Sequence, residues 1–127
     1  MRYYLLILIL ALPLPGMADP AMECSAAETQ VDVRRCLERD EERANSALSW
    51  ALGYARDASD ELDEVTGRQV VRPALETGQM SWLKFRNKHC DFVGATFGGG
   101  SGTGIAVLSC HINLTRDRVE ALMQYAQ

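Results

Sequence analysis

The chain has 127 residues, of which 47% are apolar, 24% charged and 7% aromatic, so the sequence predicts one domain with one core. Its 13 Lys and Arg residues are scattered and outnumbered by 17 Asp and Glu residues, and the net charge of −4 excludes the basic stripe that nucleic-acid phosphates select. No low-complexity tract indicates disorder, and no apolar run reaches the ~18 residues that a membrane-spanning helix needs.

The first eighteen residues have the pattern of a secretory signal. Met1 and Arg2 supply a positive start, residues 3–12 are apolar, and Gly16 and Ala18 are the small residues that a signal peptidase requires. We predict cleavage after Ala18, a single mature domain over residues 19–127, and a periplasmic or secreted location. Cleavage removes Arg2 and no acid, which leaves 12 basic against 17 acidic residues and a net charge of −5.

All four cysteines follow this signal, at Cys24, Cys36, Cys90 and Cys110. An even number of cysteines in an exported chain predicts two disulfides. Three pairings are possible, and chain order favours Cys24 with Cys36 and Cys90 with Cys110, because each pair flanks a segment that contains turn or capping residues.

The first pairing requires a bend. A disulfide needs Cα atoms within roughly 7 Å, whereas twelve residues of unbroken helix rise about 18 Å. The capping box of residues 25–28 predicts one helical turn, and Thr29 with Asp32 predicts the start of a second, differently directed helix.

The same region offers a metal-binding alternative. His89-Cys90 and Cys110-His111 supply the two cysteines and two histidines of a zinc site. Adjacent side chains on a helix point about 100° apart, however, and no pair here has the two-to-four-residue spacing of structural zinc sites. We therefore expect no metal and no cofactor, with both histidines as surface or partly buried polar residues.

A long helix is predicted first in the mature chain. From Asp32 to Arg56 apolar or small residues recur every three or four positions, which predicts one buried face. The members of this face are Val33, Cys36, Leu37, Ala44, Ala47, Leu48, Ala51, Leu52 and Ala55. Between Asp57 and Arg72 the periodicity weakens and five acids precede Gly67, so we predict a connection with helical character at best.

Two further helices follow. The second runs from Pro73, which suits a first-turn position, to Cys90 and is predicted to bury Leu75, Trp82, Leu83 and Phe85. The third runs from about Ile105 or Leu108 to Tyr125, with a buried stripe of Leu108, Ile112, Thr115, Val119 and Leu122.

A glycine-rich loop is predicted before the last helix. Residues 94–104 contain Gly94, Gly98, Gly99, Gly100, Gly102 and Gly104. The nucleotide-binding glycine motifs do not fit, because no Gly-x-Gly-x-x-Gly is present, no Lys follows and no strand precedes. Two interpretations stay open: a connection that needs several positive φ angles, or a loop that contacts a ligand or partner.

Catalytic motifs are absent from the sequence. There is no Gly-x-Ser-x-Gly elbow and no His-Glu-x-x-His. The paired carboxylates lie on a predicted solvent-exposed helix face, where acidic residues need no catalytic role. We expect a protein that is not an enzyme.

Residues distributed along the chain carry a family resemblance. Cys24, Thr29-Gln30, Asp32 and Cys36 are followed by Trp82-x-x-Phe85-Arg86-x-x-x-Cys90, by Gly99-Gly100-Ser101 and by Cys110-x-x-x-Leu114-Thr115-x-x-Arg118-x-x-x-Leu122. This order and spacing resemble the lysozyme inhibitor LprI-like family of exported bacterial proteins, over nearly the whole mature chain. The resemblance implies a small all-α, disulfide-bonded bundle of about three helices.

The resemblance also implies a binding role in the cell envelope. The expected partner is lysozyme or another basic cell-wall hydrolase, toward which a chain of charge −5 is steered, and a glycine loop is thin enough to enter a substrate cleft. The candidate contact residues are Gly99, Gly100, Ser101, Gly102 and Thr103.

Two points about this role stay open. The hydroxyls of Ser101 and Thr103 either face the catalytic carboxylates of a muramidase or form local turn hydrogen bonds. The alternative function is a structural or small-ligand-binding module of the envelope that meets its partner through the acidic face instead of the loop.

Overall fold

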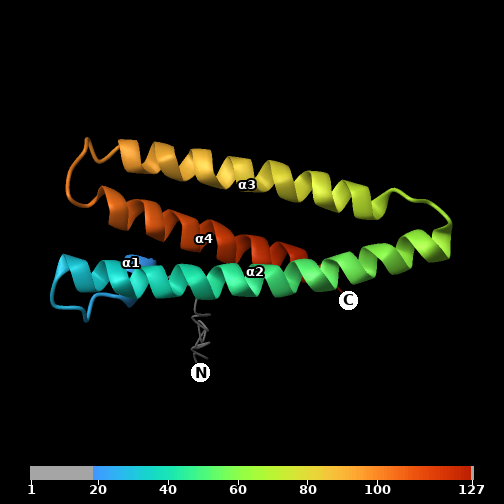
Figure 1. Cartoon of the computed structure of the whole chain (residues 1–127), viewed down its shortest axis with the longest axis horizontal. Helices are drawn as coiled ribbons and strands as arrows, with labels where there is room; N and C mark the ends of the chain where they lie inside the picture. The colour runs from blue at the N-terminus through green and yellow to red at the C-terminus, as the bar shows by residue number, and fades with distance from the viewer. Residues whose placement is uncertain (1–18, 127) are drawn as a thin grey trace, which may run out of the picture.

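The computed structural model describes residues 19–126, which form four helices and no strand (Figure 1). The helices are α1 (Pro20–Glu23), α2 (Gln30–Thr66), α3 (Val71–Ala95) and α4 (Thr103–Met123). Figure 1 shows α4 between α2 and α3, with α1 and the α3–α4 connection at the same end; past the last turn of α4, α2 and α3 continue as a pair. The predicted all-α fold is confirmed, and the predicted signal, residues 1–18, lies outside the described residues.

The two disulfides tie the helices together at the end that holds α1. Cys24, which caps α1, is bonded to Cys36 near the start of α2, with a Cα–Cα distance of 5.9 Å. Cys90 of α3 is bonded to Cys110 of α4, with a Cα–Cα distance of 5.6 Å. This is the pairing that chain order favoured, and each bridge stabilises the fold by on the order of 3 kcal/mol. Among residues 19–126, no helix is both long and apolar enough to cross a bilayer.

The bend between Cys24 and Cys36 is built differently from the prediction. Residues 25–28 form no helix; the first turn is earlier, at Pro20, where the Asp19 side chain accepts a hydrogen bond from the Ala21 N–H at 2.9 Å. An Asp cap followed by Pro is a stronger helix start than the Ser25 box, because Pro fits the first position without losing a bond. The predicted cap at Thr29 is confirmed: its Oγ1 accepts from the Asp32 N–H at 3.2 Å.

The core consists of two apolar clusters along the face that α2 presents to α4. Near the disulfides, Cys24, Leu37 and Ile112 are buried together. Farther along, Leu48, Ala51, Leu52, Ala55 and Leu122 are buried, with Leu75, Trp82 and Val119 packed against them. The predicted faces of α2 and α4 are therefore confirmed, except that Ala47 is exposed.

The helix α2 does not stop at Arg56 but continues to Thr66 as one element. The prediction of a connection from Asp57 was wrong because the buried positions continue at helical spacing as Ala55, Ser59 and Asp63. The other four acids of this stretch lie on the solvent face. The helix ends at Gly67, whose φ of 66° is the left-handed conformation that glycine adopts without strain.

The helix α3 packs through a partly polar stripe. Predicted core residues Leu83 and Phe85 are exposed, by 36% and 53%, whereas Gln79 and Cys90 are buried. Leu75, Trp82 and Arg86 are half-buried on the same face. Periodicity of apolar residues alone predicted the wrong positions, because polar side chains on this face form hydrogen bonds with α4. Arg118 donates to Gln79 Oε1 at 3.0 Å, although Gln79 Nε2 has no partner within the described residues, and the half-buried Arg86 donates to Thr115 Oγ1 at 2.9 Å.

The connection from α2 to α3 is held by carboxylates. Asp63, which is 2% exposed, accepts hydrogen bonds from the backbone N–H groups of Val70, Val71 and Arg72. Burial raises the pKa of Asp63, but the three N–H donors more than offset it, so the pKa lies below the ordinary value. Glu76 accepts from Arg56 and Arg72, and these hydrogen bonds lower its pKa to about 2.

These two carboxylates make the fold sensitive to acid. Because their pKa values are lower in the folded chain, their stabilisation is complete above the unfolded value near 4.5 and is lost as the pH falls through the folded value. We expect the free energy of unfolding to fall between about pH 5 and pH 2. Urea unfolding at a series of pH values tests this, and Glu76→Gln is expected to flatten the pH profile; an unchanged profile would contradict the role of Glu76.

Candidate partner-binding surface at the disulfide end

An open groove of about 560 Å³ runs along α4 at the disulfide end, and we call it the α4 groove. One wall is a stripe of α4, with Ile105, Ala106, Ser109, Asn113, Leu114 and Asp117, of which Ile105 also packs against the core cluster near the disulfides. The other wall is His89 and Val93 of α3 with Phe97, and Asp19 and Ala21 at α1 complete the lining. From Gly102 to Asp117 the α4 stripe covers about four turns, or roughly 22 Å.

The charge of the α4 groove is one-sided. Asp19 and Asp117 line it, and no Lys or Arg does so among residues 19–126. Both carboxylates are exposed, and within the described chain neither forms an ion pair. Asp117 has a cation on either side in sequence, but Arg116 is paired with Glu23 at 2.7 Å and Arg118 donates to Gln79 Oε1 at 3.0 Å. The pair with Arg116 lowers the pKa of Glu23.

One polar group in the α4 groove has no partner. Ser109 is only 9% exposed, and its hydroxyl makes no hydrogen bond within the described residues. An unpaired buried hydroxyl costs on the order of 1–3 kcal/mol. A ligand that donates to or accepts from this oxygen recovers that cost.

The loop predicted as a contact site adjoins the α4 groove. It comprises residues 96–102, shorter than the predicted 94–104, because Gly94 belongs to α3 and Gly104 to α4. Gly94 is buried where the helices come close, and a Cβ there would lie 2.7 Å from Val107. Phe97 and Gly102 of the loop line the groove, so the two features form one continuous surface, which we call the disulfide-end surface.

Within this loop the predicted contact residues differ in what they do. Gly98 and Gly99 have positive φ, at 60° and 78°, so part of the glycine content serves the turn. The Thr103 hydroxyl donates to the Gly100 carbonyl at 2.8 Å, which is the local turn bond that the sequence left open. Ser101 is exposed and is the loop hydroxyl that faces solvent.

An aromatic stripe on α3 extends the disulfide-end surface. The His89 ring stacks on Phe85 with centroids 5.4 Å apart and lies 6.2 Å from Phe92. Both phenylalanines are more than half exposed. An exposed row of rings beside a groove is typical of a surface that binds a partner.

The motif residues of α3, by contrast, hold the helices together. Arg86 donates to Thr115 at 2.9 Å and to Asn45 at 3.1 Å, which joins α3 to α4 and to α2. The Arg86 and Arg118 guanidinium groups lie 5.2 and 5.9 Å from the centre of the Trp82 ring. Thr115 is fully buried. These residues act in packing and not at the exposed surface.

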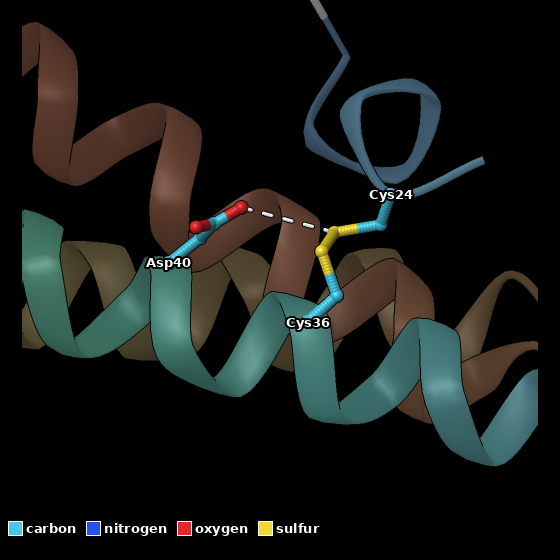
Figure 2. A group of neighbouring side chains, drawn as sticks. All are labelled: Cys24, Cys36 and Asp40. Carbon is cyan, nitrogen blue, oxygen red and sulfur yellow. Dashed lines mark hydrogen bonds between the residues drawn. A yellow bond between two sulfur atoms is a disulfide. The ribbon is translucent and has the colours of Figure 1, made fainter. Parts of the chain in front are cut away.

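The cysteines and histidines of the His89-Cys90 and Cys110-His111 pairs do not assemble into a zinc site. Cys90 and Cys110 are bonded to each other, and His111 Nδ1 lies 2.8 Å from Glu41 Oε1. Figure 2 shows the group of described residues with ligand atoms close together, Cys24, Cys36 and Asp40. Asp40 Oδ2 lies 3.7 Å from Cys24 Sγ, but a disulfide sulfur is not a thiolate, so this group is a packing contact.

A second groove, of about 390 Å³, lies where α2 and α3 continue beyond α4. Its walls include Leu62 of α2, Leu75 of α3 and Tyr125. Arg118 also lines it, so its charge is opposite to that of the α4 groove.

Sequence reasoning found the loop but missed the α4 groove. The signal was present: no Asp, Glu, Lys or Arg occurs between Asp91 and Arg116. A helix whose first turns carry no charge on any face has apolar residues beyond those that the core needs, and here Ala106 and Leu114 remain for a further contact.

Comparisons with known proteins place the chain in a family. An uncharacterized protein of Rhizobium meliloti (strain 1021) is 29% identical over 123 residues, which cover 92% of this chain and 88% of that protein. No solved structure matches. Residues 21–122 match the family described as Lysozyme inhibitor LprI. This match covers most of the chain and all four cysteines, and the chain therefore belongs to the lysozyme inhibitor LprI family.

Proposed function

We propose that this chain is an exported binding protein that inhibits lysozyme or another basic cell-wall hydrolase. In this proposal residues 1–18 are a signal cleaved near Ala18, and residues 19–127 act as one domain in the periplasm or outside the cell. Family membership supports the binding role, and the two disulfides favour an oxidising, extracytoplasmic compartment. The proposal includes no catalysis, metal or cofactor.

The observation that carries the proposal is the disulfide-end surface. Its glycine loop presents Ser101 to solvent, and the groove beside it carries two carboxylates and no lysine or arginine within the described chain. A narrow loop fits a substrate cleft, and the net charge of −5 draws a basic enzyme toward it. We assign contact to Gly99, Gly100, Ser101 and Gly102, with Thr103 supporting the loop.

The alternative, an envelope module that binds through its acidic face, is less well supported. Of the five acids between Asp57 and Glu64, Asp60 pairs with Arg72 and Asp63 caps α3. Part of that face is therefore used inside the fold. Asp57, Glu61 and Glu64 remain exposed, and we expect them to act only on approach of a basic partner.

Titration of the protein with lysozyme by calorimetry, together with protection of cell walls from lysis, tests the proposal directly. We expect binding with inhibition. Binding without inhibition would favour the alternative, and absence of binding would overturn the lysozyme role.

A charge-reversal variant separates the two surfaces. We expect Asp57→Lys, Glu61→Lys and Glu64→Lys together to slow association about ten-fold at low salt and to flatten its salt dependence, with an unchanged dissociation rate. Asp60 and Asp63 are left intact because they stabilise the fold. Stopped-flow kinetics measures both rates, and a large rise in the dissociation rate would assign the contact to the acidic face.

A further inference from the structure

We propose that the α4 groove binds a lysine or arginine side chain carried on a short apolar segment of the partner protein. The inference rests on the proposed function, since it names what a basic partner inserts beside the loop. A volume of about 560 Å³ is within the range of sites that hold small ligands, and the apolar part of its lining includes Val93, Ile105 and Leu114. Such a lining matches apolar side chains and the aliphatic stem of a basic residue.

The charges in the α4 groove select the cation. Asp19 and Asp117 are its lining carboxylates, and neither side chain has an ion-pair partner within residues 19–126. In the mature chain proposed above, Asp19 also carries the α-ammonium group of the N-terminus, so Asp117 is the carboxylate that selects the cation. Phe97, which is half-exposed, also lines the groove, and an aromatic ring is a group that attracts a cation. The groove of about 390 Å³ at the far end of the bundle is lined by Arg118 and disfavours the same ligand.

The unpartnered hydroxyl of Ser109 is an independent sign of a ligand. It lies in the lining of the α4 groove, more than nine-tenths buried, and no protein group within the described chain satisfies it. A peptide segment supplies backbone N–H and C=O groups at regular intervals, either of which pairs with a hydroxyl. The apolar lining, the two carboxylates and this hydroxyl together match a basic peptide segment better than a purely apolar ligand.

Two tripeptides test the inference without lysozyme. Acetyl-Leu-Lys-Leu-amide and acetyl-Leu-Glu-Leu-amide have the same apolar residues and opposite charge. In NMR titrations of the protein we expect the lysine peptide to shift the amides of Ser109 and Asn113 and to bind at least about ten-fold more tightly than the glutamate peptide. Equal binding of the two peptides, or shifts confined to other regions, would overturn the inference.

Matched variants locate the charge. Asp117→Asn is expected to lower the affinity for the lysine peptide about three- to ten-fold. Glu120→Gln, one turn away on the same helix and outside the groove, is expected to leave that affinity unchanged. Ser109→Ala is expected to lower the affinity for the lysine peptide about three-fold. Equal effects of Asp117→Asn and Glu120→Gln would mean that net charge alone acts, and the groove would not be the site.

A blocked groove separates this inference from the proposed function. Ala106→Trp places an indole in the groove lining, and we expect it to abolish binding of the lysine peptide and to weaken lysozyme at least ten-fold, with helical circular dichroism unchanged. If the Ala106→Trp protein fails to fold, lysozyme binding by Asp117→Asn and Ser109→Ala tests the role of the groove. Unchanged lysozyme binding by Ala106→Trp would overturn the claim that the α4 groove contacts the partner, but the proposed function would stand. If the unmodified protein bound the lysine peptide but not lysozyme, the groove would stand and the proposed function would be overturned. If the NMR shifts depended on protein concentration without peptide, the occupant of the groove would be a second copy of the chain, and the inferred basic segment would be wrong.

Discussion

Trp82→Ala is expected to lower the free energy of unfolding by about 3 kcal/mol, near the lower end of the range for large core residues, because the side chain is only half-buried. The indole packs against the cluster of Leu48, Ala51 and Leu122, and its ring lies beside the guanidinium groups of Arg86 and Arg118. Its loss leaves a cavity and removes two cation–π contacts. Urea unfolding with constant m-value measures the change, with a fall in Tm of roughly 10–20 °C.

The other tryptophan supplies a matched control for this experiment. Trp50 lies on the solvent face of α2 and is 72% exposed. Trp50→Ala removes the same atoms and is expected to change the free energy of unfolding by no more than about 0.5 kcal/mol. Equal losses for the two variants would mean that Trp82 does not belong to the core. A loss of partner binding by Trp82→Ala at unchanged stability would make it a contact residue.

Ser101→Trp is expected to raise the dissociation rate of a lysozyme complex at least about 100-fold. The loop is proposed to enter a cleft, where a bulky indole in place of a small hydroxyl clashes with groups that are fully desolvated in the complex. Ser101 is chosen because it is exposed, whereas Gly98 and Gly99 have positive φ and do not tolerate replacement without strain. Surface plasmon resonance at constant salt measures the rate.

Ser46→Trp, at an exposed serine on α2, is the control for this variant. It adds the same surface far from the loop in sequence and is expected to leave the dissociation rate within about two-fold of the original. Undiminished inhibition by a folded Ser101→Trp protein would remove the loop from the mechanism.

Most of the helical structure follows from local signals in the sequence. Thr29 caps α2, Pro73 lies in the first turn of α3, and the apolar spacing of α2 and α4 places their buried faces correctly. The extent of α2 did not follow, because Ser59 and Asp63 are polar residues on a buried face. Ser59 donates to the Ala55 carbonyl at 2.6 Å and Asp63 caps the next helix, so burial of each is compensated by partners that periodicity does not reveal.

The surface of the molecule was less predictable than its core. The loop was found from its glycines, but the α4 groove depends on how α1, α3 and α4 meet, and this arrangement is fixed by the two disulfides and by Arg86 and Thr115. Leu83 and Phe85 were placed inside because hydrophobic residues at helical spacing are usually buried. The buried Gln79 and the half-buried Arg86 lie on the packed face of α3 instead.

The claim that the disulfide-end surface is the partner-binding surface is tested most directly by hydrogen–deuterium exchange of the protein with and without lysozyme. Lysozyme is predicted to slow exchange at the backbone amides of residues 96–103 and to leave residues 57–66 of α2 unchanged. Slower exchange over residues 57–66 with none in the loop, or no change anywhere at saturating lysozyme, would contradict the claim.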